Sequence, residues 1–314
     1  MGISSSQFNR VIDLSFLPAQ NTNKLGPREK DFIPNYSVLT GKVNAKTIVC
    51  PRHGRKPEIE INGTMWANGT LPAFNVTVKN LYLDLQKEQY AKLRVRAGYD
   101  GNTTPIEGTI LSMYQESPGP EGRTVIQCQL GNIKDWLEAD VQLSFEAGTT
   151  VESIIDTLKT KLNTTQKAVG VKAKSLSLKE PFMFDGKARG AMAELEKRFS
   201  EYKLAIFVRE NMICAICLAE GDFVGTQVLK YMSAPPQPNT GSEAGTYYTT
   251  ITAPWLPKLR IGDILTIPSS VYMKNLELVG GAGRTQKIQV TAISFHFGTT
   301  GGTNRMTVQG FMVR

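Results

Sequence analysis

A β-rich block occurs twice in this chain and restricts its fold more than any other feature. The first copy runs from about residue 74 to 131 and the second from about 249 to 311. In each copy one strand leads through a short link to a second strand, and a hairpin follows. The second strand is Leu93–Arg96 in the first copy and Ile264–Ile267 in the second. The repeat predicts two similar β-domains in one chain.

The hairpins of the two copies align without a gap at a constant offset of 182 residues. Their strands cover 110–114 and 124–127 in the first copy, and 292–296 and 306–309 in the second. The identical positions are Ser112 and Ser294, Gly119 and Gly301, Arg123 and Arg305, and Gln127 and Gln309. Any two hairpins share alternating patterns, and the identities beyond that pattern suggest a duplication. A duplicated domain would let three copies imitate a sixfold ring.

Bulk composition indicates a folded, basic protein. The 314 residues are enough for two or three domains. The chain is 41% hydrophobic and 20% charged, which is not the composition of a disordered chain. Its net charge of +8 raises the expectation of a polyanionic partner. Four cysteines fit a reduced compartment. No run of ~18 apolar residues is present, so no membrane insertion is expected.

The expected fold class is mainly β with a small α/β module. Two similar antiparallel β-barrel-like (tube-like) domains would flank this α/β insert. The expected units are an N-terminal arm with strand content at 1–45, a first tube-like β-domain at 46–145, the α/β module at 146–220 and a second tube-like β-domain at 221–314. A Pro-rich segment at 234–242 predicts a surface loop or linker into the last domain.

Local patterns define the first β-domain. Between Leu93 and Ala97, apolar side chains alternate with Arg94 and Arg96, which predicts a strand with one charged face. The segment Gly98–Asn102 follows and predicts a turn, because glycine adopts positive φ angles at little cost.

The pattern changes from strand to helix at Gly148. Thr149-Thr150-Val151-Glu152 matches the capping box Thr-x-x-Glu and predicts a helix start. The apolar stripe of this helix is Val151, Ile154, Ile155, Leu158 and Leu162. A second helix is expected from Lys187 to Phe199, with Asp185 as N-cap and a stripe of Ala188, Met192, Leu195 and Phe199. The hairpin that follows has strands at 204–208 and 212–218.

Cys214-Ala215-Ile216-Cys217 is the pattern closest to a redox or zinc motif. In a strand the two thiols would point to opposite faces, with Cα atoms ~10 Å apart and so beyond the ~7 Å limit for a disulfide. No second cysteine or histidine pair completes a zinc site. We expect core cysteines here, and a simple turn around Cys50 and His53. No phosphate-binding or nucleophile motif occurs, so no catalytic residue, cofactor or metal is expected.

Basic residues gather in two places. They are Arg52, Arg55 and Lys56 in a Pro/Gly-rich turn, and Lys92, Arg94 and Arg96 along one strand. One interpretation is a solvated β-face. The other is a charged interface or lumen face near nucleic acid or an acidic protein, although no interleaved aromatics suggest base stacking.

The order of these elements resembles the baseplate hub (tail hub) proteins of tailed bacteriophages and related contractile injection systems. The matching segments are 76–81, 93–101, 107–110, 148–151, 191–199, 204–218, 247–252, Pro254, 259–264 and 288–311. The turn residues and their neighbours that carry this resemblance are Gly98, Tyr99, Asp100, Gly101, Gly108, Gly148, Gly262 and Asp263. The first block departs from the pattern, since Tyr90-Ala91 stands where the second has Gly262-Asp263.

The resemblance implies a structural protein without enzymatic activity that forms a homotrimer. Three chains would give a pseudo-sixfold ring with a tail tube protein above it, a spike or fibre protein below it and other baseplate proteins around it. DNA or tape-measure protein would pass through its channel. The expected location is the virion tail or baseplate, after assembly in the cytoplasm of the bacterial host.

Three alternatives stay open. A sequence-independent nucleic-acid-binding module is suggested by the charge of +8. A tail-associated wall-degrading enzyme would need a catalytic domain beyond the three modules. A tail adaptor or distal tail protein would have a different copy number.

Overall fold

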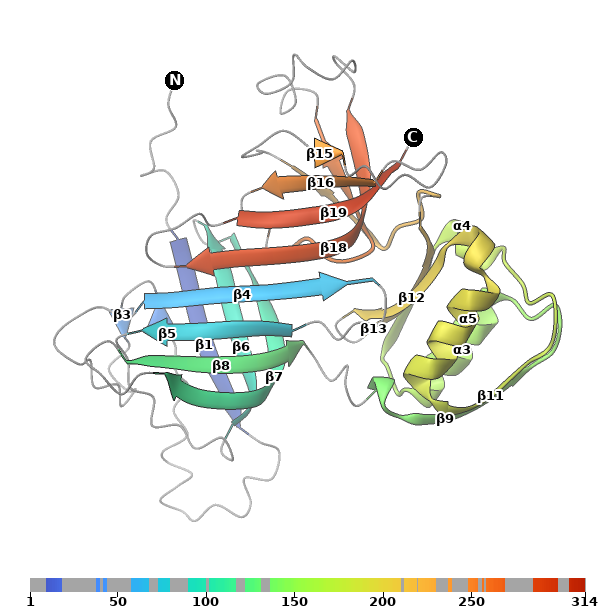
Figure 1. The fold of residues 1–314 in the computed structure, drawn as a ribbon, viewed down its shortest axis with the longest axis horizontal. Coiled ribbons are helices and arrows are strands. Elements are labelled where there is room, and N and C mark those ends of the chain that lie inside the picture. Colours follow the sequence, from blue (N-terminus) through green and yellow to red (C-terminus); the bar gives the residue numbers. More distant parts are fainter. Residues whose placement is uncertain are drawn as a thin grey trace, which may run out of the picture.

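The computed structural model describes residues 10–18, 38–39, 42–43, 58–67, 73–79, 90–99, 102–116, 122–130, 136–209, 212–218, 220–229, 237–238, 248–253, 256, 258–268, 285–298 and 305–313. Most of the described strands belong to one twelve-stranded sheet, and a compact module with helices lies at its side (Figure 1). The prediction of a mainly β chain with a small α/β module is confirmed.

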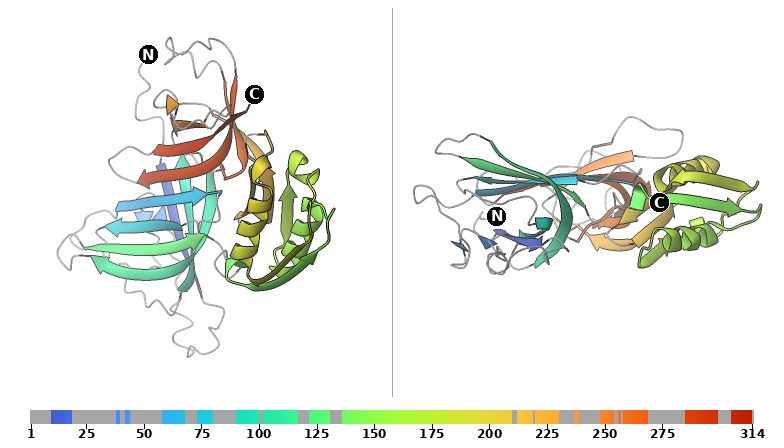
Figure 2. Two further views of the ribbon diagram at one scale, coloured as in Figure 1. Left: turned by 45° about the vertical axis from the view of Figure 1, so that its right-hand side comes forward. Right: turned by 90° about the horizontal axis from the view of Figure 1, so that it is seen from below.

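The first β-half is a curled sheet. Its strands are β1 (Arg10–Pro18), β4 (Glu58–Trp66), β5 (Ala73–Lys79), β6 (Tyr90–Tyr99), β7 (Asn102–Glu116) and β8 (Arg123–Leu130). Strands β2 (Val38–Leu39) and β3 (Lys42–Val43) form a separate pair. The long strand β7 pairs with β6 along its first part and with β8 along its second. As a result β1 and β6 form a layer that crosses behind β4, β5 and β8 (Figures 1 and 2).

Apolar side chains fill the space between these layers. Ile12 and Leu14 of β1 are buried in the same core as Leu93, Phe74 and Val76. The strand expected in the N-terminal arm is therefore part of the large sheet. Tyr99 of β6 faces Asn102 of β7, so the turn is shorter than expected and only two residues separate the strands.

The second β-half repeats the strand order of the first. Its strands are β14 (Gly225–Val228), β15 (Gln237–Pro238), β16 (Tyr248–Ala253), β17 (Asp263–Ile267), β18 (Gln286–Gly298) and β19 (Arg305–Val313). The spatial order β16-β19-β18-β17 matches β5-β8-β7-β6, and β15 pairs with β16 as β4 pairs with β5. The predicted duplication is confirmed at the level of topology. Strand β15 lies within the Pro-rich segment that was expected to be a loop.

The gapless alignment of the two hairpins is wrong by two residues in one strand. In the first hairpin a bulge at Leu111 separates Ile110, which faces Cys128, from Ser112, which faces Gln127. In the second, the bulge at Thr291 separates the pairs Val290–Gly310 and Ala292–Gln309. Strands β8 and β19 keep the offset of 182, whereas β7 and β18 are offset by 180. The second hairpin has a loop two residues longer, and sequence identity alone did not reveal this insertion.

Strand β4 joins the two halves. It pairs with β5 on one side and with β18 on the other, where Trp66 faces Ala292 and Glu60 faces Gly298. β18 pairs with β17 as far as Gln289 and with β4 from Ala292 onward. The two β-halves therefore share one sheet and one continuous apolar core.

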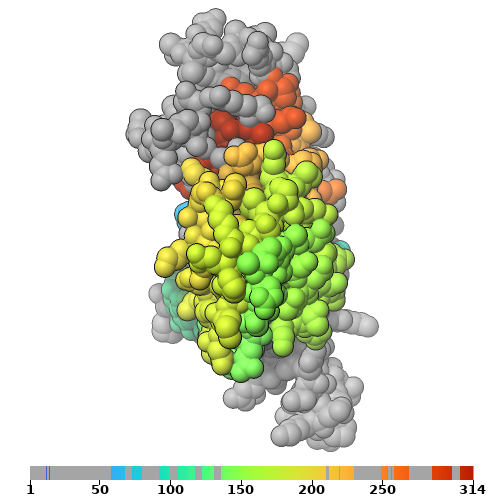
Figure 3. Space-filling model, turned by 90° about the vertical axis from the view of Figure 1, so that its right-hand side faces the viewer, coloured from blue at the N-terminus to red at the C-terminus, as the bar shows by residue number. Residues whose placement is uncertain are grey.

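The α/β module lies between β8 and β14 in the chain. Its elements are β9 (Asp140–Phe145), α3 (Val151–Lys161), β10 (Gln166–Val169), α4 (Val171–Lys174), β11 (Phe182–Lys187), α5 (Ala188–Arg198), a 3-10 turn (Ser200–Tyr202), β12 (Leu204–Arg209) and β13 (Met212–Cys217). Figure 3 looks onto the side of the molecule that the module occupies. Both predicted apolar stripes are buried in its core, which also takes in Leu137, Val141 and Leu143.

Both predicted helix starts need correction. Thr150, rather than Thr149, caps α3, because its Oγ1 accepts a hydrogen bond from Ser153 N over 3.3 Å. Glu152 instead forms an ion pair with Lys174 over 3.2 Å. Helix α5 begins after Lys187 without a side-chain cap, and Asp185 lies in strand β11. Short polar residues near a helix start do not by themselves identify which one caps it.

The hairpin β12–β13 attaches the module to the second β-half. Phe207, Cys214 and Ile216 pack into the core of the β-halves. Residues on the other face, such as Ile206 and Cys217, pack into the core of the module. Because both faces of this hairpin are buried, the module and the β-halves form one packed body.

Two buried carboxylates fix this attachment. Asp222 accepts hydrogen bonds from three backbone N–H groups, those of Lys172, Ala173 and Cys217, over 2.8–3.0 Å. Its backbone carbonyl accepts from Gln289 Nε2 in β18. A carboxylate with several backbone donors is well stabilised in the interior.

Asp263 forms the second link. Its Oδ1 lies 2.6 Å from Arg209 Nη1 of β12, and its Oδ2 accepts a hydrogen bond from Arg260 N. Burial raises the pKa of Asp263, and the charge of Arg209 opposes this rise. The ion pair ties the module to β17.

Gly63 provides a specific test of the junction between the halves. A Cβ atom at this position would lie 2.4 Å from the ring of Phe295 in β18 and 2.9 Å from Cβ of Phe74 in β5. We expect Gly63→Val to lower the free energy of unfolding by about 3 kcal/mol through overpacking. Chemical denaturation measures this change. Thr64→Val, at the next and exposed position, is the control and should change stability by less than about 0.5 kcal/mol. Equal effects of both variants would contradict the proposed role of Gly63.

Candidate assembly surface

Eight strands form a continuous surface across both halves, in the order β7-β8-β5-β4-β18-β19-β16-β15. We call this set the wall sheet. It includes only the second parts of β7 and β18, Ser112–Glu116 and Ala292–Gly298. One face of the wall sheet packs on the core through residues such as Ile61, Val76 and Phe297. The opposite face carries mostly polar side chains, together with the exposed aromatic residues Trp66 and Tyr114.

The polar face is built from rows of side chains that cross the strands. One row consists of Ser112, Gln127, Asn75, Asn62, His296 and Arg305, each opposite the next. Ser112 Oγ donates a hydrogen bond to Gln127 Oε1 over 2.6 Å, and His296 is hydrogen-bonded to Asn62. The second of these bonds crosses the junction between the halves. Most of the row is uncharged and strongly hydrophilic.

Charges of both signs lie on the same face. A second row contains Glu58, Lys79, Arg123 and Glu116, in the order β4, β5, β8, β7. Lys79 Nζ lies 2.5 Å from Glu60 Oε1 and 3.9 Å from Glu58 Oε2. Because two acidic groups flank two basic groups in this row, the face does not present a purely positive surface to a polyanion.

The two halves of the wall sheet are staggered. Ser112 begins the first row, and the equivalent residue in the second half is Ala292. The row that starts at Ser112 reaches His296 across the junction, four residues beyond Ala292. A displacement of this kind, if repeated at each junction, is what a sheet needs in order to close into a tilted barrel.

The basic strand lies in the layer that β1 and β6 form behind the wall sheet. Lys92, Arg94 and Arg96 belong to β6, which pairs with β1 and the first part of β7. Arg94 donates two hydrogen bonds to Glu107 of β7 over 2.9 and 3.1 Å, and Lys92 lies 3.8 Å from the same carboxylate. Glu107 therefore partly neutralises the positive charge of Lys92 and Arg94. We call Lys92, Arg94 and Arg96 the basic strip. Arg52, Arg55 and Lys56 lie outside the described residues.

Several glycines of the expected pattern have structural roles. Gly108 is buried in β7, where a Cβ atom would lie 2.6 Å from the ring of Phe74. Gly148 and Gly262 have φ angles of +85° and +82°, which favour glycine. Gly98 and Tyr99 lie in strand β6, and Asp263 forms the ion pair with Arg209. Asp100 and Gly101 lie outside the described residues.

Sequence reasoning missed the residues that hold the surface in place. Gly63, Asp222 and Gln289 belong to no recognised motif, and each contacts a residue far away in the chain. The signal available was indirect. A glycine inside an alternating strand marks a close approach of another element.

The cysteines among the described residues belong to the two apolar cores. Cys128, Cys214 and Cys217 are buried and form no disulfide. Cys214 faces the core of the β-halves and Cys217 that of the module, as expected for residues three apart in a strand. The part of the chain that the structure describes contains no group of three His, Cys, Asp or Glu side chains that could hold a metal ion.

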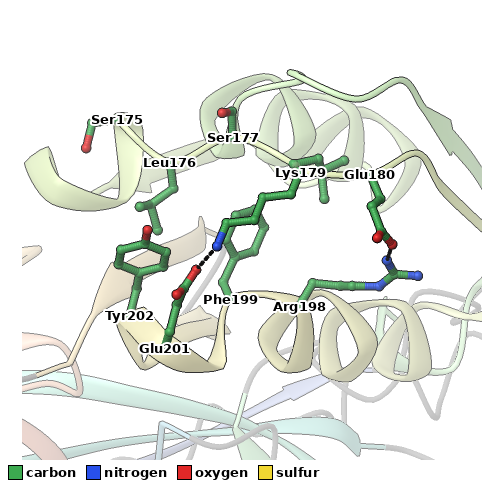
Figure 4. A pocket seen from close by; sticks show the side chains of 10 residues that line it. Ser175, Leu176, Ser177, Lys179, Glu180, Arg198, Phe199, Glu201 and Tyr202 are labelled. Atoms are coloured by element: carbon green, nitrogen blue, oxygen red, sulfur yellow. Dashed lines mark hydrogen bonds and ion pairs between the residues drawn. The ribbon is translucent and has the colours of Figure 1, made fainter.

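The module carries an open pocket of about 340 Å³ (Figure 4). Its charged side chains are paired across it: Lys179 lies 2.6 Å from Glu201, and Arg198 lies 3.2 Å from Glu180. The hydrogen bond with Glu201 raises the pKa of Lys179. These are solvent-exposed ion pairs, which contribute little to stability and leave no activated group. Among the described helices, none combines the length and apolar character that crossing a bilayer requires.

No protein-family profile matches the sequence, and the search of curated proteins found no match. Solved structures do match. The E. coli c3393 protein has a TM-score of 0.55 at 9% identity, over 85% of this chain and 76% of its own. It is described as a type VI secretion component with structural similarity to the T4 bacteriophage tail proteins gp27 and gp5.

The fold is that of phage tail proteins. The 43 kDa tail protein of prophage MuSo2 from Shewanella oneidensis matches with a TM-score of 0.52 at 10% identity, over 98% of this chain and 97% of its own. A chain of the Francisella PdpA–VgrG complex matches with a TM-score of 0.50 at 8% identity, over 97% of this chain and 58% of its own. The resemblance to tail hub proteins inferred from the sequence is confirmed for the fold.

The burial of the thiols predicts slow alkylation. Desolvation raises the pKa of Cys128 and Cys217 to about 12, from 9.0. At pH 8 this lowers the thiolate fraction roughly 1000-fold, and the thiolate is the reactive form. We expect iodoacetamide to leave both residues unmodified in the native protein and to modify both after unfolding in guanidinium, as read by peptide mass spectrometry. Rapid labelling of native Cys217 would contradict its assignment as a core residue.

Proposed function

We propose that the chain is a structural baseplate or tail hub protein, without enzymatic activity, that forms a trimeric pseudo-sixfold ring. One observation carries this proposal: a single chain presents two equivalent four-strand units, joined edge to edge in one wall sheet. The fold shared with tail proteins supports a place in a phage tail or a related injection apparatus.

The internal duplication supports the symmetry of the ring. Strands β7, β8, β5 and β4 form one unit, and β18, β19, β16 and β15 form the other. Three chains would supply six such units. A protein with threefold symmetry could then meet a sixfold tail tube on one side and a threefold spike or fibre on the other. In this proposal the two tube-like β-domains and the α/β insert are the functional units of the chain.

The expected size of the ring supports a channel. Twenty-four strands spaced ~4.8 Å apart give a circumference of roughly 115 Å, and strand tilt widens this further. The backbone of the ring would therefore measure roughly 35–45 Å across. The core of each unit lies on one face of the wall sheet, so its polar face would line the opening.

The side chains of the polar face favour passage of a polymer through the channel over tight binding of that polymer. The amides, hydroxyls and paired charges of the lining are hydrated. Glu58, Glu60 and Glu116 repel a polyanion and so oppose its tight binding. DNA or tape-measure protein would slide along such a lining. The basic strip of Lys92, Arg94 and Arg96 lies on the other layer, and we propose it as a contact for an acidic neighbour in the baseplate.

Partners and location follow from the same proposal. The ring would lie between a tail tube protein and a spike or fibre protein, with other baseplate proteins around it. One similar structure belongs to a PdpA–VgrG complex, which supports assembly with further components. The particle would be a virion tail or baseplate, assembled in the bacterial cytoplasm.

The trimer is tested by mass. Native mass spectrometry and light scattering of the purified chain, over a range of concentrations, should give about three times the 34.6 kDa of one chain. Large obligate interfaces, often over ~2,000 Å², predict that the trimer persists on dilution. A hexamer would favour the alternative of an adaptor or distal tail protein. A monomer at every concentration would contradict the proposal.

Binding of duplex DNA separates the hub from a nucleic-acid-binding module. Because acidic side chains share the polar face and Glu107 pairs with the basic strip, we expect negligible binding at ~50 mM salt. Fluorescence anisotropy with a labelled duplex measures this. Tight binding that falls steeply with salt would support the alternative.

A further inference from the structure

The wall sheet has two ends in the single chain. One end is the edge of β7 from Ser112 to Glu116, on the side opposite β8. The other end is the outer edge of β15. Within the described residues no strand pairs with either edge. The two ends lie far apart, since six strands separate them.

The junction inside the chain shows how such an edge is filled. Strand β18 parts from β17 after Gln289 faces Ile264, and β4 takes over from Ala292. Strand β7 parts from β6 at the equivalent point, where Thr109 faces Lys92. After this point β18 has β4 beside it, whereas no described strand takes the corresponding place beside β7. The equivalent of β4 is β15, at a constant offset of 175 residues, since Asn62 faces Asn75 and Gln237 faces Thr250.

We propose that β15 of one copy pairs antiparallel with the edge of β7 in the next copy, with Gln237 opposite Glu116 and Pro238 opposite Gln115. The inference rests on the proposed ring and specifies its interface. The register is copied from the internal junction, in which Asn62 faces His296. Gln237 is the equivalent of Asn62, and Glu116 is the equivalent of His296.

Exposed apolar side chains support this edge as an interface. Leu111, the bulge residue of β7, is 42% exposed, and Tyr114 is equally exposed. The equivalent bulge residue in the other half, Thr291, is only 9% exposed, and its carbonyl accepts a hydrogen bond from Ala67 N at the end of β4 over 2.9 Å. A neighbouring copy would cover Leu111 as β4 covers Thr291.

The proline in β15 makes this edge selective for the strand that pairs with it. Proline has no N–H group, so it lowers the number of ladder bonds that an arbitrary strand could form there. Natural sheets use proline at exposed edges to prevent unspecific pairing. Only a partner that adds side-chain contacts, such as the β7 edge with Leu111 and Tyr114, would then bind well.

Engineered disulfides test the register. In a Cys50→Ser background, the aligned pairs are Glu116→Cys with Gln237→Cys, and Gln115→Cys with Pro238→Cys. Adjacent positions in an antiparallel ladder alternate in geometry, so at least one pair should have Cβ atoms close enough to bond. The control pair, Met113→Cys with Gln237→Cys, is three residues out of register and ~10 Å too far. Single-cysteine variants control for the native thiols.

The readout is a non-reducing gel beside native mass spectrometry. We expect mild oxidation of an aligned pair to convert the 34.6 kDa chain into a covalent trimer, and the control pair to stay uncross-linked. A trimer by mass in which neither aligned pair cross-links would overturn the proposed register and leave the hub in place. A disulfide formed within one chain would also overturn it. A chain that is monomeric and not cross-linked would overturn both proposals.

A second variant tests the edge without cysteine. Leu111→Asp should weaken the trimer by at least tenfold in dissociation constant, because it places a charge in the contact between copies. Met183→Asp is the control, since Met183 is 81% exposed on β11 of the module, outside the wall sheet. Unchanged assembly of a folded Leu111→Asp variant, with native circular dichroism, would contradict the proposed interface.

Discussion

The backbone ladder between β4 and β18 is the interaction on which the rest of the structure depends. It converts two curled halves into one sheet, and it sets both the stagger of the polar rows and the shared core. Gly63 permits this ladder, because the ring of Phe295 and the Cβ atom of Phe74 occupy the space where its side chain would be. A long-range pairing of this kind is stabilised by burial on one face and by hydrogen bonds along the edge.

The α/β module is held to this sheet by the apolar face of hairpin β12–β13 and by a few buried polar groups. The carboxylate of Asp222 gathers three backbone donors from α4 and β13, and Gln289 connects the same site to β18. Because these groups would be costly to leave unpaired, they fix one orientation of the module. The module is thus a rigid extension of the second half.

Local periodicity was sufficient to predict much of this fold. The helix stripe that begins at Val151, the alternation around Val95 and the opposite faces of Cys214 and Cys217 all follow from the geometry of single elements. Pairing between distant strands does not follow from this geometry, because no residue pattern in β4 identifies β18 as its partner. The bulges at Leu111 and Thr291 were also hidden, because a bulge shifts register without changing the alternating pattern much. The cap of α3 moved by one residue for a similar reason, since Thr149 and Thr150 are chemically equal.

Tandem duplication also has a kinetic consequence. Of six junctions in a ring built from three chains, the three between β4 and β18 form inside a chain, as part of folding. The two strands of each such junction belong to one chain, so they meet at a high effective concentration that does not depend on the protein concentration. Only the remaining three depend on collisions between chains. A fused pair of domains therefore assembles with fewer encounters than six separate subunits, and at lower abundance in the cell.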